Sequence, residues 1–142
     1  MKISTKGRYS LKAAGILAES YGEGPMNVKA ISEKGNISES YLEQLLSSLR
    51  KSDIIETVRG AQGGYLLKKQ PSEITVGDVL RAAEGDISPT ECTSDGFQND
   101  CVNDCITKKV WEKLKLGIDG VVDSITIEDL INKEKLWKKL FI

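Results

Sequence analysis

Three cysteines stand close together in a chain that has no others. Cys92, Cys101 and Cys105 follow the spacing Cys-x8-Cys-x3-Cys. Thiolates are soft ligands that select zinc, copper(I) or iron–sulfur clusters. The tight Cys-x2-Cys knuckle of zinc sites is absent, and so is the four-cysteine run of a four-iron ferredoxin. With one further donor, the three thiolates are a suitable ligand set for a two-iron cluster.

The fourth donor is not a histidine, because the chain contains none. An aspartate or glutamate, a backbone group, a solvent molecule or a residue of a partner subunit remains. Two other interpretations of the same pattern stay open. The cysteines are either redox-active thiols without a metal, or inert side chains.

The segment that carries the cysteines differs in kind from its neighbours. Residues 84–104 contain six acidic residues and no lysine or arginine, and they lack periodic apolar positions. A loop this long within a compact domain is usually functional or disordered. We therefore expect residues 84–105 to form a cluster-binding loop. Its acidic residues are Glu84, Asp86, Glu91, Asp95, Asp100 and Asp104.

A long amphipathic helix is predicted directly after the cysteines. Apolar residues repeat at helical spacing from Ile106 to Ile125. A helix of about 20 residues spans about 30 Å, which is longer than the small preceding domain requires. The simplest partner for its apolar face is a second copy across a two-fold axis. Thr126 and Asp129 then predict a capping box for a last helix, so residues 106–142 should form a dimerisation helix and a C-terminal helix.

The N-terminal part of the chain predicts two helices joined by a short turn and followed by a hairpin. A helix over residues 38–51 buries one face through Leu42, Leu45, Leu46 and Leu49, with Ser38 as its N-cap. A shorter helix, Val28 to Lys34, and a Gly35-Asn36 turn precede it. Strand-like runs at 54–59 and 65–67 flank a glycine-rich turn, which indicates a hairpin.

This layout predicts a mainly α fold, a winged helix-turn-helix with a small β-hairpin wing and a long C-terminal dimerisation helix, whose DNA-binding domain covers residues 1–83. Residues 1–81 carry 12 basic and 9 acidic side chains, whereas residues 82–142 carry 8 and 12, so the basic half coincides with the DNA-binding shape. No apolar run approaches the roughly 20 residues that span a bilayer. No secretory signal is visible, and the odd cysteine count favours a cytoplasmic location.

Three stretches resemble a known family. They are similar to the bacterial iron–sulfur cluster regulators of the IscR type, and they cover Met1 to Tyr9, Ser40 to Leu45 and Val58 to Leu66. The N-terminal half also resembles CymR-type repressors. The resemblance implies a homodimeric transcription factor that binds a double-stranded DNA operator. It implies base contacts from Ser40, Glu43 and Gln44 and a wing arginine, Arg59, in the minor groove. The full set of DNA-binding residues that it implies is Ser38, Ser40, Tyr41, Glu43, Gln44, Arg59 and Gln62.

The sequence departs from the IscR type at the metal ligands. Cys92 and Cys105 match the outer cysteines of that type, Cys101 lies nearer the third, and Lys108 stands where the ligand histidine would be. We expect a regulator, not an enzyme, that senses iron–sulfur status through a [2Fe-2S] cluster and controls iron–sulfur biogenesis genes. The alternatives are a cluster-free CymR-like repressor of sulfur metabolism acting through a protein partner, a thiol redox sensor, and, from another class, a redox enzyme or electron carrier.

Overall fold

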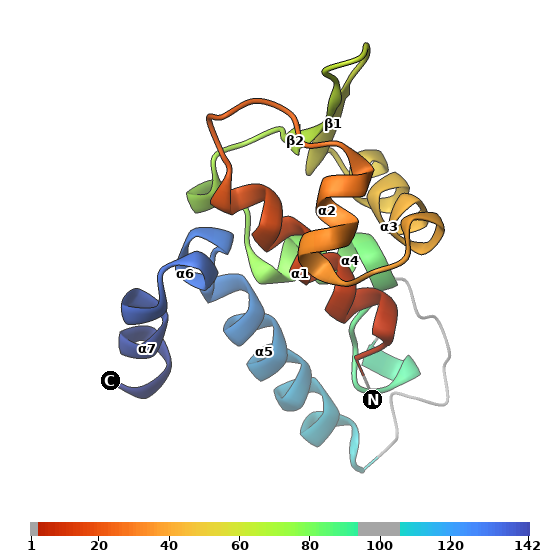
Figure 1. Ribbon diagram of the computed structural model, residues 1–142. Helices are drawn as coiled ribbons and strands as arrows, with labels where there is room; N and C mark the ends of the chain where they lie inside the picture. The colour runs from red at the N-terminus through yellow and green to blue at the C-terminus, as the bar shows by residue number, and fades with distance from the viewer. Residues whose placement is uncertain (1–2, 94–105) are drawn as a thin grey trace.

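The computed structural model describes residues 3–93 and 106–142, apart from the side chain of Cys92. The structure is mostly helical with one antiparallel hairpin (Figure 1), which confirms the predicted fold class. No helix within these two ranges is long and apolar enough to cross a bilayer. The elements are α1 (Thr5–Glu19), α2 (Val28–Gly35), α3 (Glu39–Lys51), β1 (Ile55–Val58), β2 (Gly64–Leu67), η1 (Pro71–Glu73), α4 (Val76–Glu84), η2 (Glu91–Thr93), α5 (Lys108–Ser124), α6 (Ile127–Ile131) and α7 (Lys133–Phe141).

Helix α1 is the centre of the core. It packs against α2, α3, α4, α6 and strand β2 (Figure 1). The predicted leucine face of α3 is fully enclosed, because Leu42, Leu45, Leu46 and Leu49 each have 0% of their surface exposed. Burying such a side chain contributes about 1.5–3 kcal/mol, so this face fixes the rotation of α3 about its own axis.

The turn between α2 and α3 sets the angle between the two helices. Asn36 follows α2 in the left-handed conformation with φ 52°, which asparagine tolerates better than most residues. The Ser32 hydroxyl donates a hydrogen bond to the carbonyl oxygen of buried Ile37. A Cβ at Gly35 would lie 3.1 Å from Cδ1 of Ile16, so the glycine lets the end of α2 approach α1 closely.

The hairpin is joined to the helical core at one edge. Strands β1 and β2 pair with Ile55 opposite Leu67 and Val58 opposite Gly64. Tyr65 and Met26 exchange backbone hydrogen bonds of 2.8 and 2.9 Å, which tie β2 to the segment before α2. Gly64 has φ 152°, and a Cβ there would lie 2.3 Å from the Met26 carbonyl oxygen. Only glycine permits this approach.

The predicted last helix is in fact two helices. The Thr126–Asp129 capping box begins α6 as expected, but Asn132 is extended, with φ −113° and ψ 93°. Its side-chain oxygen accepts a 3.1 Å hydrogen bond from the Lys135 backbone N–H, so Asn132 is the N-cap of α7. The expectation of one continuous helix was wrong because this local side-chain-to-backbone bond competes with helix continuation.

A buried carboxylate holds α7 to the preceding helices. Asp129 has no exposed surface; its Oδ2 accepts hydrogen bonds from the Thr126 backbone N–H at 2.9 Å and from Lys139 Nζ at 2.5 Å. Burial alone would raise the pKa of Asp129, but these hydrogen bonds outweigh it and hold the pKa below its usual value. Lys139 also donates to the Ser124 carbonyl oxygen at 2.8 Å. The carboxylate therefore joins the end of α5, α6 and α7.

Helix α5 has an apolar face that the described chain leaves open. Val110, Leu114 and Val121 are 58%, 45% and 57% exposed. Together with Ile3 and Leu80 they line an apolar groove of about 820 Å³. The helix is thus amphipathic, as the sequence predicts, but its apolar face is only partly covered by α4 and the start of the chain.

Candidate nucleic-acid interface

The exposed face of α3 carries the side chains that sequence reasoning assigned to base contacts. Ser40, Glu43 and Gln44 are all exposed, on the side of the helix opposite the buried leucines. Their hydroxyl, carboxylate and amide groups provide donors and acceptors for base edges in a major groove. The structure therefore brings these three residues together on one accessible surface.

Two further predicted DNA-binding residues also have structural roles at the start of α3. The Ser38 hydroxyl accepts a hydrogen bond from the Tyr41 backbone N–H at 3.4 Å, which makes Ser38 the N-cap. The ring of Tyr41 is half-buried and meets Tyr9 of α1 edge to face, with 6.1 Å between ring centroids and 85° between planes. Both residues fix the first turn of α3 against α1.

The wing presents the last two predicted residues. Figure 1 shows the hairpin projecting beyond the helices beside α2 and α3. Arg59 and Gln62 are exposed in its turn, and no ion pair among the described residues includes Arg59. A Cβ at Gly63 would lie 2.0 Å from the Val58 carbonyl oxygen, so this tight turn requires glycine there. An unpaired guanidinium on a projecting turn is suited to a nucleic-acid groove.

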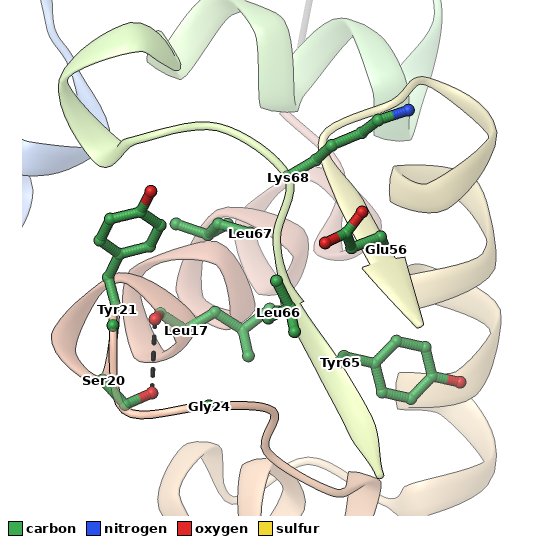
Figure 2. A pocket seen from close by; sticks show the side chains of 10 residues that line it. Leu17, Ser20, Tyr21, Gly24, Glu56, Tyr65, Leu66, Leu67 and Lys68 are labelled. Atoms are coloured by element: carbon green, nitrogen blue, oxygen red, sulfur yellow. Dashed lines mark hydrogen bonds between the residues drawn. The ribbon is translucent and has the colours of Figure 1, made fainter. Parts of the chain in front are cut away.

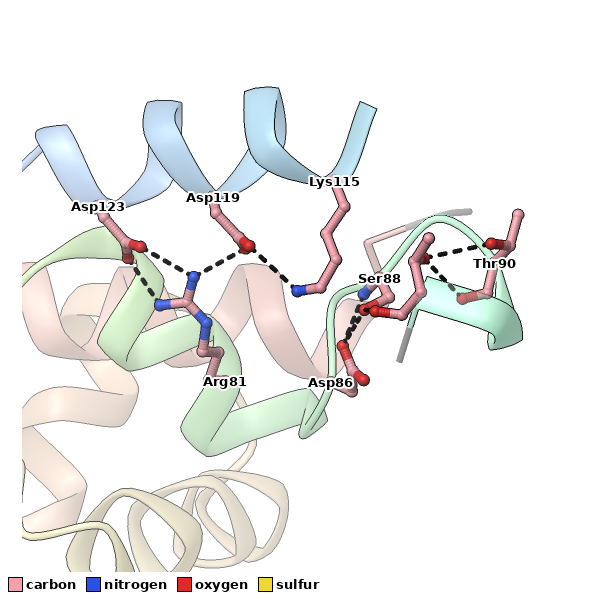
Figure 3. Close-up of polar contacts among 8 residues, drawn as sticks. Arg81, Asp86, Ser88, Thr90, Lys115, Asp119 and Asp123 are labelled. Carbon is pink, nitrogen blue, oxygen red and sulfur yellow. Dashed lines mark hydrogen bonds and ion pairs between the residues drawn. The ribbon is translucent and has the colours of Figure 1, made fainter. Parts of the chain in front are cut away.

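Helix α5 is fastened to the DNA-binding part by an ion-pair network that sequence reasoning missed. Arg81 of α4 donates to both carboxylate oxygens of Asp123, at 2.6 and 3.0 Å, and to Asp119 at 3.0 Å (Figure 3). Lys115 donates to the other Asp119 oxygen at 3.1 Å. A Cβ at Gly77 would lie 2.0 Å from an Asp123 oxygen, so the glycine lets α5 approach α4.

The ion-pair network shifts the pKa values of Arg81 and Asp119. The hydrogen bonds that Arg81 donates to Asp123, together with the one to Asp119, raise the pKa of Arg81 further above its ordinary value. Burial alone would raise the pKa of Asp119, but hydrogen bonds from Lys115 and Arg81 hold it below its usual value. Arg81 and Asp119 are therefore charged near neutral pH. The sequence signal was the i,i+4 pair of aspartates on α5, but nothing local shows which cation they face.

A second missed contact lies where the cysteine-containing segment begins. The Ser4 backbone N–H and hydroxyl both donate to Oε1 of Glu84, the last residue of α4, and the backbone bond is 2.5 Å long. A Cβ at Gly7 would lie 2.6 Å from the same oxygen. The first turn of α1 is thus clasped to the residue from which the acidic segment departs.

The predicted metal ligands are only partly covered by the structure. The backbone of Cys92 lies in η2, whereas Cys101 and Cys105 lie outside the described residues. Among the residues that are described, no three histidine, cysteine, aspartate or glutamate side chains are grouped so that they could hold a metal ion. The geometry of the cysteine constellation therefore stays a prediction.

A pocket of about 350 Å³ lies behind the wing, between the end of α1 and β2 (Figure 2). Leu17 and Leu67 give it an apolar lining, and Glu56 and Lys68 stand at its strand side. Two buried polar atoms of the described residues lack a hydrogen-bond partner, and neither of them, Ser10 Oγ or Asp129 Oδ1, belongs to the pocket lining. The pocket is separate from the exposed face of α3.

The helix-turn-helix, its polar outward face and the wing define the protein as a DNA-binding transcriptional regulator and not an enzyme. Residues 3–133 match the family model Rrf2, described as an iron-dependent transcriptional regulator. The chain belongs to the Rrf2 family.

Two kinds of relative are similar to almost the whole chain. The HTH-type transcriptional regulator CymR of Bacillus subtilis (strain 168) is 44% identical over 130 residues, covering 92% of this chain and 89% of the relative. The HTH-type transcriptional regulator IscR of Serratia proteamaculans (strain 568) is 41% identical over 135 residues, covering 94% and 81%.

The solved structures show the same pair of likenesses. The structure of CymR, the global cysteine regulator of B. subtilis, superposes with a TM-score of 0.79 at 41% identity, covering 94% of this chain and 98% of that one. IscR of T. potens superposes with a TM-score of 0.76 at 43% identity, covering 94% and 88%. Similarity of the whole chain thus does not separate the two kinds of regulator.

The lowered pKa of Asp119 predicts a pH-dependent contribution to stability. Because the folded-state pKa lies below that of the unfolded chain, about 3.9, the ionised carboxylate stabilises the fold above that pH and loses its effect as pH falls through the folded-state pKa. Asp119→Asn should therefore lower the melting temperature at pH 7, and the difference from the unmodified protein should shrink at acid pH. Thermal unfolding followed by circular dichroism measures both.

The matched control is Glu33→Gln, an exposed acid of α2 that takes part in no ion pair among the described residues. It should leave the melting temperature nearly unchanged at every pH. A difference for Asp119→Asn that stays constant from neutral to acid pH would contradict the assignment of its stabilisation to the charged network.

Proposed function

We propose that this Rrf2-family regulator senses iron–sulfur status through a [2Fe-2S] cluster held by Cys92, Cys101 and Cys105 and controls iron–sulfur biogenesis genes. The observation that carries the proposal is the cysteine constellation itself. All three cysteines of the chain lie between α4 and α5, in a family whose model is described as iron-dependent. A DNA-binding regulator of this kind works where the bacterial DNA is, which favours the cytoplasm.

The chemistry of the donor set fits such a cluster. Three thiolates satisfy all but one of the four protein ligands that a two-iron centre takes. Asp100 and Asp104 are the nearest acidic residues in the sequence, and a backbone group or a residue of a second subunit are the other sources of the fourth donor. A bound cluster of this type would supply a redox-active centre whose net charge depends on its oxidation state and whose assembly depends on iron supply.

The described contacts on either side of the cysteines suggest how their state reaches the DNA-binding part. The segment departs from Glu84, which is clasped to Ser4 of the α1 N-cap. It returns into α5, which Arg81 holds against α4. A change in the segment therefore acts on two fixed points of the winged helix. Thermodynamic linkage requires that DNA binding then change cluster affinity by the same factor.

The division of labour along the chain follows. Residues 1–83 are the DNA-binding domain, residues 84–105 the cluster-binding loop, and residues 106–142 the dimerising and C-terminal part. The exposed apolar face of α5 supports a homodimer, since burying Val110, Leu114 and Val121 against a second copy removes an apolar surface from water. A dimer presents two α3 helices to two half-sites.

The proposed DNA-binding residues fall into those that contact base edges and those that position the protein on the DNA. Ser40, Glu43 and Gln44, exposed on α3, are assigned to base edges. Ser38 and Tyr41, which shape the first turn of α3, are assigned to backbone positioning. Arg59 and Gln62 of the wing are assigned to the neighbouring minor groove and its phosphates.

A second candidate function rests on the 44% identity to CymR. In that case the chain is a cluster-free repressor of cysteine or sulfur metabolism that acts through a protein partner. The three cysteines then serve as redox-sensitive thiols or have no chemical role.

The cluster assignment predicts the colour of the protein. Chain prepared without oxygen, or reconstituted with iron and sulfide, should absorb visible light. Alanine in place of any one of Cys92, Cys101 and Cys105 should abolish or greatly weaken that absorbance, because two thiolates are too few to hold the cluster. Replacing the ligating acid, tested as Asp100→Asn and Asp104→Asn, should shift the spectrum and leave absorbance, because three thiolates remain.

Glu112→Gln, an acid on α5 outside the cysteine segment, is the control and should leave the spectrum unchanged. A reconstituted protein that stays colourless while it binds its operator would contradict the cluster assignment and favour the cluster-free repressor.

The proposed DNA contacts predict that two substitutions weaken DNA binding in different ways. Gln44→Ala should cost about 1–3 kcal/mol of binding free energy at one base position of a site selected from random duplexes, because one good base contact is lost. Arg59→Ala should weaken binding to such sites and reduce the salt dependence of the affinity, because a wing cation is removed. Lys133→Ala on α7 is the control. If Gln44→Ala weakens every sequence equally, it is a positioning residue.

The dimer assignment predicts a change of mass in solution. Val110→Asp combined with Val121→Asp should yield monomers by light scattering at micromolar concentration, because two charges would be buried in the apolar contact. Leu116→Asp, an exposed α5 residue that does not line the groove, should leave the dimer intact. A double variant that stays dimeric would show that α5 is not the interface.

A further inference from the structure

A groove of about 600 Å³ lies between α1, α2 and α6, and we propose that it is a docking site for an acidic amphipathic segment of a partner protein. Its apolar lining comes from Leu11 and Ile16 of α1 and from Leu130 and Ile131 of α6. Grooves of this size and lining receive the apolar face of a short helix, whose side chains enter at positions three and four apart.

The rim of the groove is cationic. Arg8, Lys12 and Lys34 are exposed at its edge, against one acid, Glu19. Within the described part of the chain, no ion pair includes any of these three cations. Unneutralised positive charge around an apolar floor complements a partner that is apolar on one face and acidic on the other.

A glycine keeps the groove open. Gly15 lies in the interior of α1, where glycine is less favourable than alanine. A Cβ at this position would meet no atom within 4 Å, so close packing inside the chain does not require the glycine. The missing side chain instead deepens the groove between the cationic rim and the α6 leucine and isoleucine.

The position of the groove favours a protein over DNA as its occupant. DNA phosphates match the cations but leave an apolar floor exposed. Figure 1 shows α6 on one side of α1 and α3 on the other, so the apolar floor that α6 supplies does not lie on the α3 side of α1. The chain's own α7 does not fit, because its lysines repeat the charge of the rim.

The test uses the full-length protein and two fluorescent peptides of about 16 residues. One has leucines spaced three and four apart with glutamate elsewhere, and the other has lysine in place of glutamate. The glutamate peptide should bind saturably by fluorescence anisotropy, and at least tenfold more tightly than the lysine peptide. Gly15→Leu, which fills the groove, should weaken binding of the glutamate peptide at least tenfold, and Lys12→Glu combined with Lys34→Glu should do the same.

Two variants are matched controls. Gly120→Leu places the same side chain at another helical glycine with open space, on α5 and outside both grooves. Lys133→Glu reverses one charge on α7. Both should bind the glutamate peptide as the unmodified protein does, and Gly15→Leu should bind a random-sequence duplex with unchanged affinity.

Three results would overturn the proposal. The first is binding of both peptides alike, or of neither. The second is a loss of duplex affinity in Lys12→Glu/Lys34→Glu with no change in peptide affinity, which would assign the cations to DNA. The third is a change in mass of Gly15→Leu by light scattering, which would make the groove an interface between copies of this chain.

Discussion

Burial of four leucines on one side of α3 is the constraint on which the DNA-binding surface depends. Leu42, Leu45, Leu46 and Leu49 have no exposed surface, and each contributes about 1.5–3 kcal/mol by leaving water. Rotating α3 to present another face would lose several of these contributions at once. The leucines must stay buried, so the opposite face of α3 is the one that meets solvent. That face carries Ser40, Glu43 and Gln44. The same burial fixes where the hairpin leaves the core, since Ile54 and Ile55 follow α3 directly into it.

The rest of the chain is joined to this unit by apolar packing of α5 and α6 and by polar contacts of a different strength. The Arg81–Asp123 pair is bidentate and shares its guanidinium with Asp119, a geometry that favours a defined orientation. These side chains are partly exposed, and such pairs typically contribute about 0–1 kcal/mol each. They therefore orient α5 more than they stabilise the fold. Helix α5, which has no fully buried residue, is also less enclosed than α3.

Features that depend on neighbouring residues could be predicted from the sequence, whereas contacts between distant residues could not. The predicted N-caps Ser38 and Thr126 are confirmed, because capping involves only the next three residues. The break at Asn132 was missed because the apolar spacing continues across it from α6 into α7. The partner of Asp119 and Asp123 was missed because several cations compete for them and only the fold brings Arg81 close. For the candidate site, exposure of the α3 and wing residues followed from the pattern, whereas the arrangement of Cys101 and Cys105 lies outside the described residues.

Similarity to the two kinds of relative does not show what this chain senses. Both are 41–44% identical to this chain and superpose on most of it, so the shared fold does not separate them. The segment between α4 and α5 contains all three cysteines and five acidic residues, without one lysine or arginine. Like charges confined to one segment repel each other, and thiolates add to that repulsion. The two ends of the segment are held by the hydrogen bonds between Ser4 and Glu84 and by the contacts of Arg81 with α5. Its composition and these two points of attachment therefore set the segment apart from the winged helix that it joins.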